Sequence, residues 1–144
     1  MILYVDTSAL VKLYVEEPLS HELTVAVAEA EAVATSLIAY AETRAAFARA
    51  RREARLSAQI YRRMVEAFIE DWPRYIAVEV TDQLVKDAGD LAGSRALRGY
   101  DALHLASSLS LSRQVTASVT FLAFDRALSL AAKQEGLCLH TPRA

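Results

Sequence analysis

The sequence has very little cysteine, because Cys138 is the only one in its 144 residues. A single thiol excludes a disulfide bond within the chain, and this cysteine usage fits a reducing compartment. Cys138 lies between two leucines, so we expect it to be a small buried apolar residue and not a nucleophile. These features favour a cytoplasmic protein.

Long apolar runs are also missing. No stretch approaches the roughly 18 consecutive apolar residues that a membrane-spanning helix needs. The first apolar run, residues 2–5, has no basic region before it and is ended by Asp6, which is unlike a secretory signal peptide. We therefore expect a soluble chain that does not contact a membrane.

An excess of basic charge is absent as well. The chain has 16 Lys and Arg against 18 Asp and Glu, a formal net charge of -2, so it is not a general basic coat for nucleic acid. Any binding of nucleic acid must use a local patch, and one basic region fits: Arg44, Arg49, Arg51, Arg52, Arg55, Arg62 and Arg63, with Glu53 as its one acid. This region is a candidate for contact with RNA phosphate, a solvated helical face, or a surface for an acidic partner segment.

Apolar strand-like segments alternate with helical patterns along the whole chain. We expect strands at 2–5, 32–35, 76–80, 118–123 and 137–140, and helices at 7–15, 19–31, 37–50, 58–71, 82–92, 102–111 and 126–135. Such alternation predicts βαβ units. The predicted fold is a three-layer α/β/α sandwich with a central parallel sheet of four to five strands, in a single domain of residues 1–144.

Hydroxyl side chains precede several of the predicted helices. Thr7 or Ser8, Ser36, Ser57 and Thr81 are expected to cap them. A loop is expected around Gly93, Ser94 and Gly99, and Gly136 is well placed just after the last helix.

Four carboxylates fall where the chain reaches one edge of the predicted sheet. Asp6 and Asp125 directly follow strands, Asp101 opens a helix, and the longer side chain of Glu42 can reach back from its helix. In parallel sheets this edge is where ligands bind. Each acid also has a simpler interpretation, as a helix cap for Asp6, Asp101 and Asp125 and as a solvated residue for Glu42.

Four carboxylates gathered in one place repel one another and raise one another's pKa values, which favours a bound divalent cation. Oxygen ligands suit Mg²⁺ or Mn²⁺. Such a site can activate water against a phosphodiester, so hydrolysis there needs no Ser or Cys nucleophile.

Other side chains lie near these acids in the sequence. Arg98 and Arg126 each lie within three residues of a predicted ligand, and with Arg44 they are the candidates for holding RNA phosphate. His104 follows Asp101 by one turn, and we expect a packed or hydrogen-bonded histidine there and not a metal ligand.

Four segments together resemble PIN-domain ribonucleases. They are Ile-Leu-Tyr-Val-Asp-Thr-Ser-Ala-Leu at the start, Ala-Glu-Thr-Arg around Glu42, Tyr-Asp-Ala-Leu-His-Leu-Ala around Asp101, and Phe-Leu-Ala-Phe-Asp-Arg-Ala-Leu around Asp125. They occur in the family's order, from Met1 to about Gly136. The small size is similar to VapC-type toxins of toxin–antitoxin pairs.

The resemblance implies a Mg²⁺- or Mn²⁺-dependent endoribonuclease with a PIN-like fold. It implies metal-binding and catalytic roles for Asp6, Glu42, Asp101 and Asp125, and a place in the site for Ser8. It also implies a homodimer and a cognate antitoxin protein. The chain departs from the family at Ala123, where many members have a hydroxyl that supports the last acid.

Two other functions remain open from the sequence. A catalytically weak PIN-like module would act only by binding a partner, and Ala123 is compatible with it. An aspartyl-phosphate phosphotransferase also places Asp after its first strand, but its pattern requires a second Asp where this chain has Ser8.

Overall fold

The first strand, β1 (Ile2–Val5), is the middle strand of a five-stranded sheet in the computed structural model, which describes residues 1–53 and 56–140. The strand order is β3-β2-β1-β4-β5, and every neighbouring pair is parallel. The chain builds outward from β1 first on the β2 side and later on the β4 side. The carboxyl end of β1 is therefore a topological switch point, where open α/β sheets place their ligand sites.

The elements alternate along the chain as expected. The remaining strands are β2 (Ala32–Ser36), β3 (Ile76–Val78), β4 (Val119–Leu122) and β5 (Cys138–Leu139). The helices are α1 (Thr7–Lys12), α2 (Ser20–Glu29), α3 (Ala39–Arg52), α4 (Ala58–Asp71), α5 (Asp82–Arg95), α6 (Gly99–Gln114) and α7 (Arg126–Gln134), with a 3-10 turn, η1 (Trp72–Arg74), after α4.

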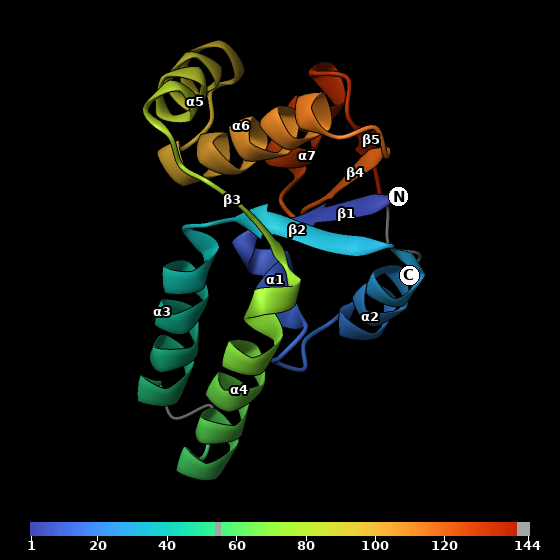
Figure 1. The fold of residues 1–144 in the computed structure, drawn as a ribbon. Coiled ribbons are helices and arrows are strands. Elements are labelled where there is room, and N and C mark those ends of the chain that lie inside the picture. Colours follow the sequence, from blue (N-terminus) through green and yellow to red (C-terminus); the bar gives the residue numbers. More distant parts are fainter. Residues whose placement is uncertain (54–55, 141–144) are drawn as a thin grey trace.

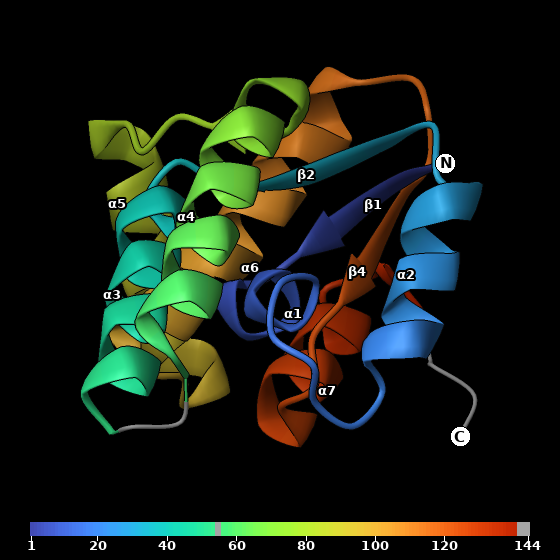
Figure 2. The ribbon, with the colours of Figure 1, turned by 90° about the horizontal axis from the view of Figure 1, so that it is seen from below.

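The sheet lies between two layers of helices, so the predicted three-layer sandwich with a parallel sheet is confirmed. Figure 1 shows α5, α6 and α7 on one face and α1 to α4 on the other, and Figure 2 shows α3 and α4 side by side. Side chains of β1 alternate between the faces, since Tyr4 packs in one apolar core and Leu3 and Val5 in the other. Because both faces are covered, all four residues of β1 are buried.

Two predicted helix caps are confirmed and two are wrong. The side chains of Ser57 and Thr81 accept hydrogen bonds from the backbone N–H groups of Ile60 and Leu84. At α1 the cap is Asp6 and neither Thr7 nor Ser8, because the Asp6 carboxylate takes the Ala9 N–H. At α3 the cap residue is Ile38 with no side-chain bond, because the chain turns for two residues after β2 before the helix begins.

Several element boundaries also differ from the prediction. Helix α1 ends at Lys12 and not near residue 15, because the chain turns there before Pro18. Gly93 and Ser94 belong to α5 and not to a loop. The loop starts later because α5 continues to Arg95, and Ala96 directly after it adopts the left-handed conformation at φ 54°. Gly136 has a φ of 92°, as expected of a residue that follows a helix end.

Cys138 is exposed, although it was expected to be buried, and Val85 is 49% exposed. Cys138 lies on β5, an edge strand that pairs only with β4. Val85 belongs to α5, where its neighbours Leu84 and Ala88 take the buried positions. No helix in residues 1–53 and 56–140 is long and apolar enough to span a membrane.

Replacing Thr81 with Ala is expected to lower the free energy of unfolding by about 1 kcal/mol, because the Leu84 N–H loses its acceptor at the start of α5. Thr81→Ser, which keeps the hydroxyl, is the control and should stay near the original value. Urea unfolding of the three proteins measures the difference. Equal loss in both variants would show that the cap bond does not stabilise α5.

Candidate active site

Asp6 is the single residue between the end of β1 and the start of α1, so these two elements fix its position. Its Oδ1 accepts a hydrogen bond from the Ala9 backbone N–H at 3.0 Å, and the Ser8 hydroxyl donates to Oδ1 at 2.9 Å and to Oδ2 at 3.0 Å. The residue is only 5% exposed. Asp6 is therefore both the helix cap of the simpler interpretation and a carboxylate at the switch point.

Burial raises the pKa of Asp6 above its usual value, and its hydrogen bonds oppose this shift without cancelling it. The negative charge of Asp101 raises this pKa as well. Asp6 is thus a buried carboxylate near a second carboxylate, an arrangement that a cation would stabilise.

Glu42 lies in the first turn of α3 and is held by residues from two other helices. The Thr7 hydroxyl donates to Glu42 Oε1 at 2.6 Å, and His104 Nε2 lies 3.1 Å from the same oxygen. Burial alone raises the pKa of Glu42, but the hydrogen bonds from His104 and Thr7 outweigh it and hold that pKa below its usual value. Glu42 is therefore poised as an ionised group.

His104 is buried on α6 and connects the core to Glu42. Its Nδ1 lies 2.9 Å from the Tyr4 hydroxyl, and its Nε2 also lies 3.0 Å from the Thr7 hydroxyl oxygen. An ionised carboxylate only accepts hydrogen bonds, so Nε2 carries the proton that faces Glu42. In the neutral ring Nδ1 then accepts from Tyr4, whose pKa burial raises well above its usual value.

The other two predicted acids lie at the starts of helices. Asp101 is in the first turn of α6, where its Oδ2 lies 3.3 Å from Nε of Arg98. Asp125 caps α7, because its Oδ1 accepts from the Leu128 backbone N–H at 2.8 Å. The cap bond orients Asp125 in the absence of a hydroxyl at Ala123.

One cavity brings all four acids together. It has a volume of about 390 Å³, and its lining is Asp6, Thr7, Ser8, Lys12, Glu42, Arg98, Tyr100, Asp101, His104, Phe124 and Asp125. We call it the acid-lined cavity. Its oxygen donors come from four separate elements and match the ligand preference of Mg²⁺ and Mn²⁺. Within the described parts of the chain, however, no three His, Cys, Asp or Glu side chains are close enough together to hold a metal as they stand.

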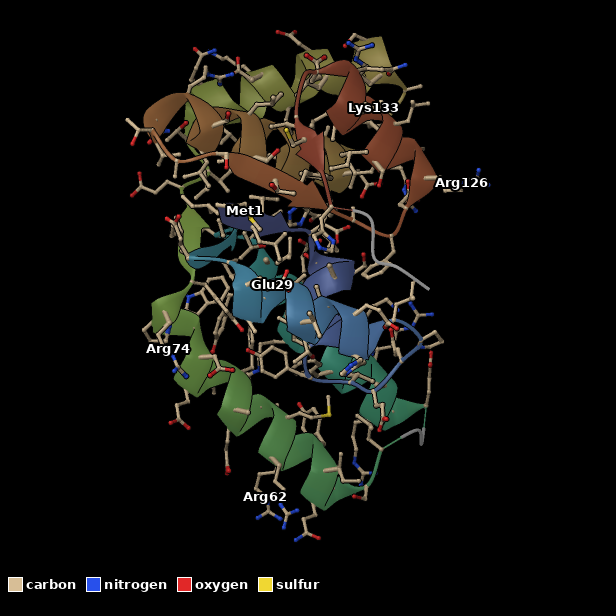
Figure 3. All side chains as sticks on the ribbon, turned by 90° about the vertical axis from the view of Figure 1, so that its right-hand side faces the viewer. Met1, Glu29, Arg62, Arg74, Arg126 and Lys133 are labelled. Atoms are coloured by element: carbon tan, nitrogen blue, oxygen red, sulfur yellow. The ribbon has the colours of Figure 1, made fainter. Side chains whose placement is uncertain are left out.

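Of the three arginines predicted to contact RNA phosphate, only Arg98 lines the acid-lined cavity. The side chain of Arg44 donates to the Tyr40 hydroxyl at 3.0 Å and lies over the Tyr40 ring. Arg126 is exposed at the start of α7 and points outward in Figure 3.

The arginine-rich region lies mainly on the exposed faces of α3 and α4. Arg49 pairs with Glu53 at 3.0 Å, and Figure 3 shows Arg62 at the end of this layer far from the sheet. Arg55 lies outside the described residues. The solvated-face interpretation fits these positions.

The sequence did not indicate several residues that line the cavity. Thr7 appeared only as a possible cap, yet its hydroxyl holds Glu42. Lys12 pairs with Glu17 at 2.8 Å and lies over the ring of Phe124, which also lines the cavity. The prediction that His104 is a packed or hydrogen-bonded histidine is confirmed. Its contact with Glu42 was not predicted.

Comparison with known proteins agrees with this architecture. The PIN domain family matches residues 3–134. Ribonuclease VapC45 and Ribonuclease VapC49 of Mycobacterium tuberculosis (strains CDC 1551 / Oshkosh and ATCC 25618 / H37Rv) are each 36% identical over 110 residues, which cover 76% of this chain and 76% of each relative.

A solved structure supports the fold independently. The crystal structure of FitAcB from Neisseria gonorrhoeae matches with a TM-score of 0.67 and 17% identity, covering 99% of this chain and 98% of that one. At this identity the match shows a common fold alone. With the family match and the two relatives, it leads to one conclusion: the chain belongs to the PIN-domain family and is VapC-like within it.

Proposed function

We propose that this chain is a divalent-metal-dependent endoribonuclease and the toxin of a toxin–antitoxin pair. The observation that carries the proposal is the acid-lined cavity at the carboxyl end of β1, where Asp6, Glu42, Asp101 and Asp125 meet. The ribonuclease names of the two relatives support RNA as the substrate. The resemblance to VapC-type toxins supports a cognate antitoxin, a homodimer, a cytoplasmic location and one PIN-like domain over residues 1–144.

In this proposal Asp6, Glu42, Asp101 and Asp125 hold Mg²⁺ or Mn²⁺. When bound, the cation adds positive charge for the phosphate and lowers the pKa of a water molecule. Ser8 holds both oxygens of Asp6 in place. Thr7 and His104 both contact Oε1 of Glu42, and such supporting contacts orient the oxygens that bind a metal.

The substrate phosphate lies against Arg98 at the rim of the cavity, with Arg44 and Arg126 as weaker candidates for contact with RNA. Water attacks phosphorus, forming a new P–O bond while the bond from phosphorus to the ribose 3′-oxygen breaks. One proton leaves the attacking water, and the 3′-oxygen takes up a proton. The products carry a 5′-phosphate and a 3′-hydroxyl.

The nature of the RNA ends tests this reaction. The purified chain is incubated with RNA and Mg²⁺ or Mn²⁺, and the new ends are mapped. A second substrate has a 2′-deoxynucleotide on the 5′ side of each mapped bond. Because water and not the 2′-hydroxyl attacks, this strand should be cut at a similar rate. Products ending in a cyclic phosphate, or an uncut 2′-deoxy strand, would contradict the proposed reaction.

A binding module without catalysis is the second candidate, and one observation favours it. Asp125 is exposed and held by a single cap bond, next to Ala123 where the family's hydroxyl is missing. This candidate gains support if the purified chain with Mn²⁺ cuts no RNA but binds its antitoxin tightly. A phosphoryl group trapped on Asp6 would instead support the phosphotransferase.

A further inference from the structure

A second, larger cavity opens beside the acid-lined cavity. It lies between α5 and α6 and has a volume of about 650 Å³. Its lining is Val85, Ala88, Gly89 and Ala92 from α5, Gly99, Tyr100, Asp101 and Leu103 from α6, with Arg98 and Glu42. We call it the α5–α6 groove. Its size is within the range of sites for small organic ligands, and its walls are mainly apolar.

The α5–α6 groove is continuous with the acid-lined cavity. Glu42, Arg98, Tyr100 and Asp101 line both of them. An RNA strand with its phosphate at Arg98 therefore presents the next group along the strand to the groove. In RNA that group is a ribose and its planar base, whose ring faces can stack on aromatic side chains.

The exposed apolar side chains in the groove fit a base. Tyr100 is 64% exposed at the boundary of the two cavities, and Val85 on the opposite helix is 49% exposed. Exposed aromatic rings stack on bases of single-stranded RNA, whose base edges and faces are free. The exposed side chain of Val85 therefore forms part of one wall of the groove.

Small residues of α5 line the groove and leave space in it. Ala88 and Ala92 lie on the same face of α5 as Val85 and Gly89, at spacings of three and four residues. A Cβ added at Gly89 would meet no atom within 4 Å, so packing does not require glycine there. Gly89 has no side chain, so a larger residue at this position would extend into the groove.

From these observations we propose that the α5–α6 groove is a nucleobase subsite. It holds the base of the nucleotide next to the cleaved bond, with Tyr100 stacked on the base and Val85 opposite. This inference rests on the proposed function, because it concerns the RNA that the acid-lined cavity cleaves. It adds that a base, and not only the sugar-phosphate backbone, determines which strands are cut.

Filling the groove tests the subsite. Gly89→Leu places a side chain in the groove, while Gly93→Leu places the same side chain one turn farther along α5, where a Cβ also meets no atom within 4 Å. Gly93 does not line the groove, so it is the matched control. The substrates are a single-stranded RNA containing a mapped cleavage site and the same strand with an abasic nucleotide next to the cleaved bond.

The unmodified chain and Gly93→Leu should cut the complete strand with a kcat/KM about tenfold higher than the abasic strand, the ratio typical of one stacked base. Gly89→Leu should cut both strands equally, at the rate of the abasic strand. Tyr100→Ala should behave like Gly89→Leu, which keeps the test valid if Gly89→Leu fails to fold.

Three results would overturn the subsite while leaving the proposed function intact. The first is an equal kcat/KM of the unmodified chain on the complete and the abasic strand. The second is that Gly89→Leu and Gly93→Leu have the same kcat/KM on each strand. The third is that Gly89→Leu lowers kcat/KM by the same factor on both strands. A change of molecular mass in light scattering for Gly89→Leu alone would assign the groove to contact between two copies of the chain, and would also overturn it. If the unmodified chain cuts neither strand, the proposed function itself fails, and the subsite with it.

Discussion

Replacing Asp6 with Asn is expected to lower the rate of RNA cleavage by at least about a hundredfold, as removal of one preorganised charged group from an active site typically does. The substitution removes one negative charge from the lining of the acid-lined cavity and leaves the shape of the side chain almost unchanged. The measurement is kcat/KM on RNA with Mn²⁺ present in excess.

The same substitution should not weaken the fold. Asn caps helices as well as Asp does, so the bond from the Ala9 N–H is kept. Burial disfavours the ionised Asp6, as its raised pKa shows, and the neutral amide avoids that cost. In EDTA the melting temperature of Asp6→Asn should therefore equal or exceed that of the unmodified chain.

Asp82→Asn is the matched control for Asp6→Asn. Asp82 is an exposed acid at the start of α5 that pairs with Lys86 at 3.0 Å. Its loss should leave both cleavage and melting temperature unchanged. If Asp6→Asn keeps full activity, or loses activity only together with its fold, Asp6 is not a metal ligand.

Replacing His104 with Ala is expected to weaken Mn²⁺ binding and RNA cleavage by about 10- to 100-fold, the usual effect of removing a group that orients a metal ligand. Glu42 would lose the donor at 3.1 Å, and Thr7 alone would hold it. Mn²⁺ affinity is measured by calorimetry on the metal-free protein, which separates this effect from catalysis.

Loss of His104 also affects the core, so a variant must distinguish the two effects. His104→Ala removes the buried hydrogen bond between the ring of His104 and the Tyr4 hydroxyl, and losing one such bond costs about 1 kcal/mol of stability. Tyr4→Phe breaks the same bond while His104 still contacts Glu42. It should therefore lose stability but keep its Mn²⁺ affinity close to that of the original protein. His104→Gln, which retains an N–H donor, should lie closer to the original protein than His104→Ala. Equal Mn²⁺ affinities in His104→Ala and Tyr4→Phe would show that His104 has only a structural role.

The sequence predicted the layers of the fold because its strong signals are local. An unbroken apolar run such as Ile2–Val5 indicates a strand that is buried on both faces, and helices between such strands impose parallel pairing. The end of each helix was less predictable. At α1 three neighbouring residues can act as the cap. Asp6 accepts the Ala9 N–H, while the Thr7 hydroxyl donates to Glu42 and the Ser8 hydroxyl to Asp6.

The acids of the site were predictable from their places after strands and at helix starts. Asp6 also shows that a cap and a site carboxylate are not exclusive alternatives, since one oxygen accepts the Ala9 N–H while the residue still lines the cavity. Contacts between distant helices were not predictable. The bond from His104 to Glu42 joins residues 62 positions apart, and the α5–α6 groove depends on how two helices pack.

RNA cleavage before and after removal of divalent metal tests the proposed role of the acid-lined cavity most directly. The purified chain is assayed in excess EDTA and again after Mg²⁺ or Mn²⁺ is added in excess over the chelator. Because four carboxylates are proposed to work only through a bound cation, cleavage should disappear in EDTA and return with either metal. Cleavage that persists in excess EDTA would contradict this role.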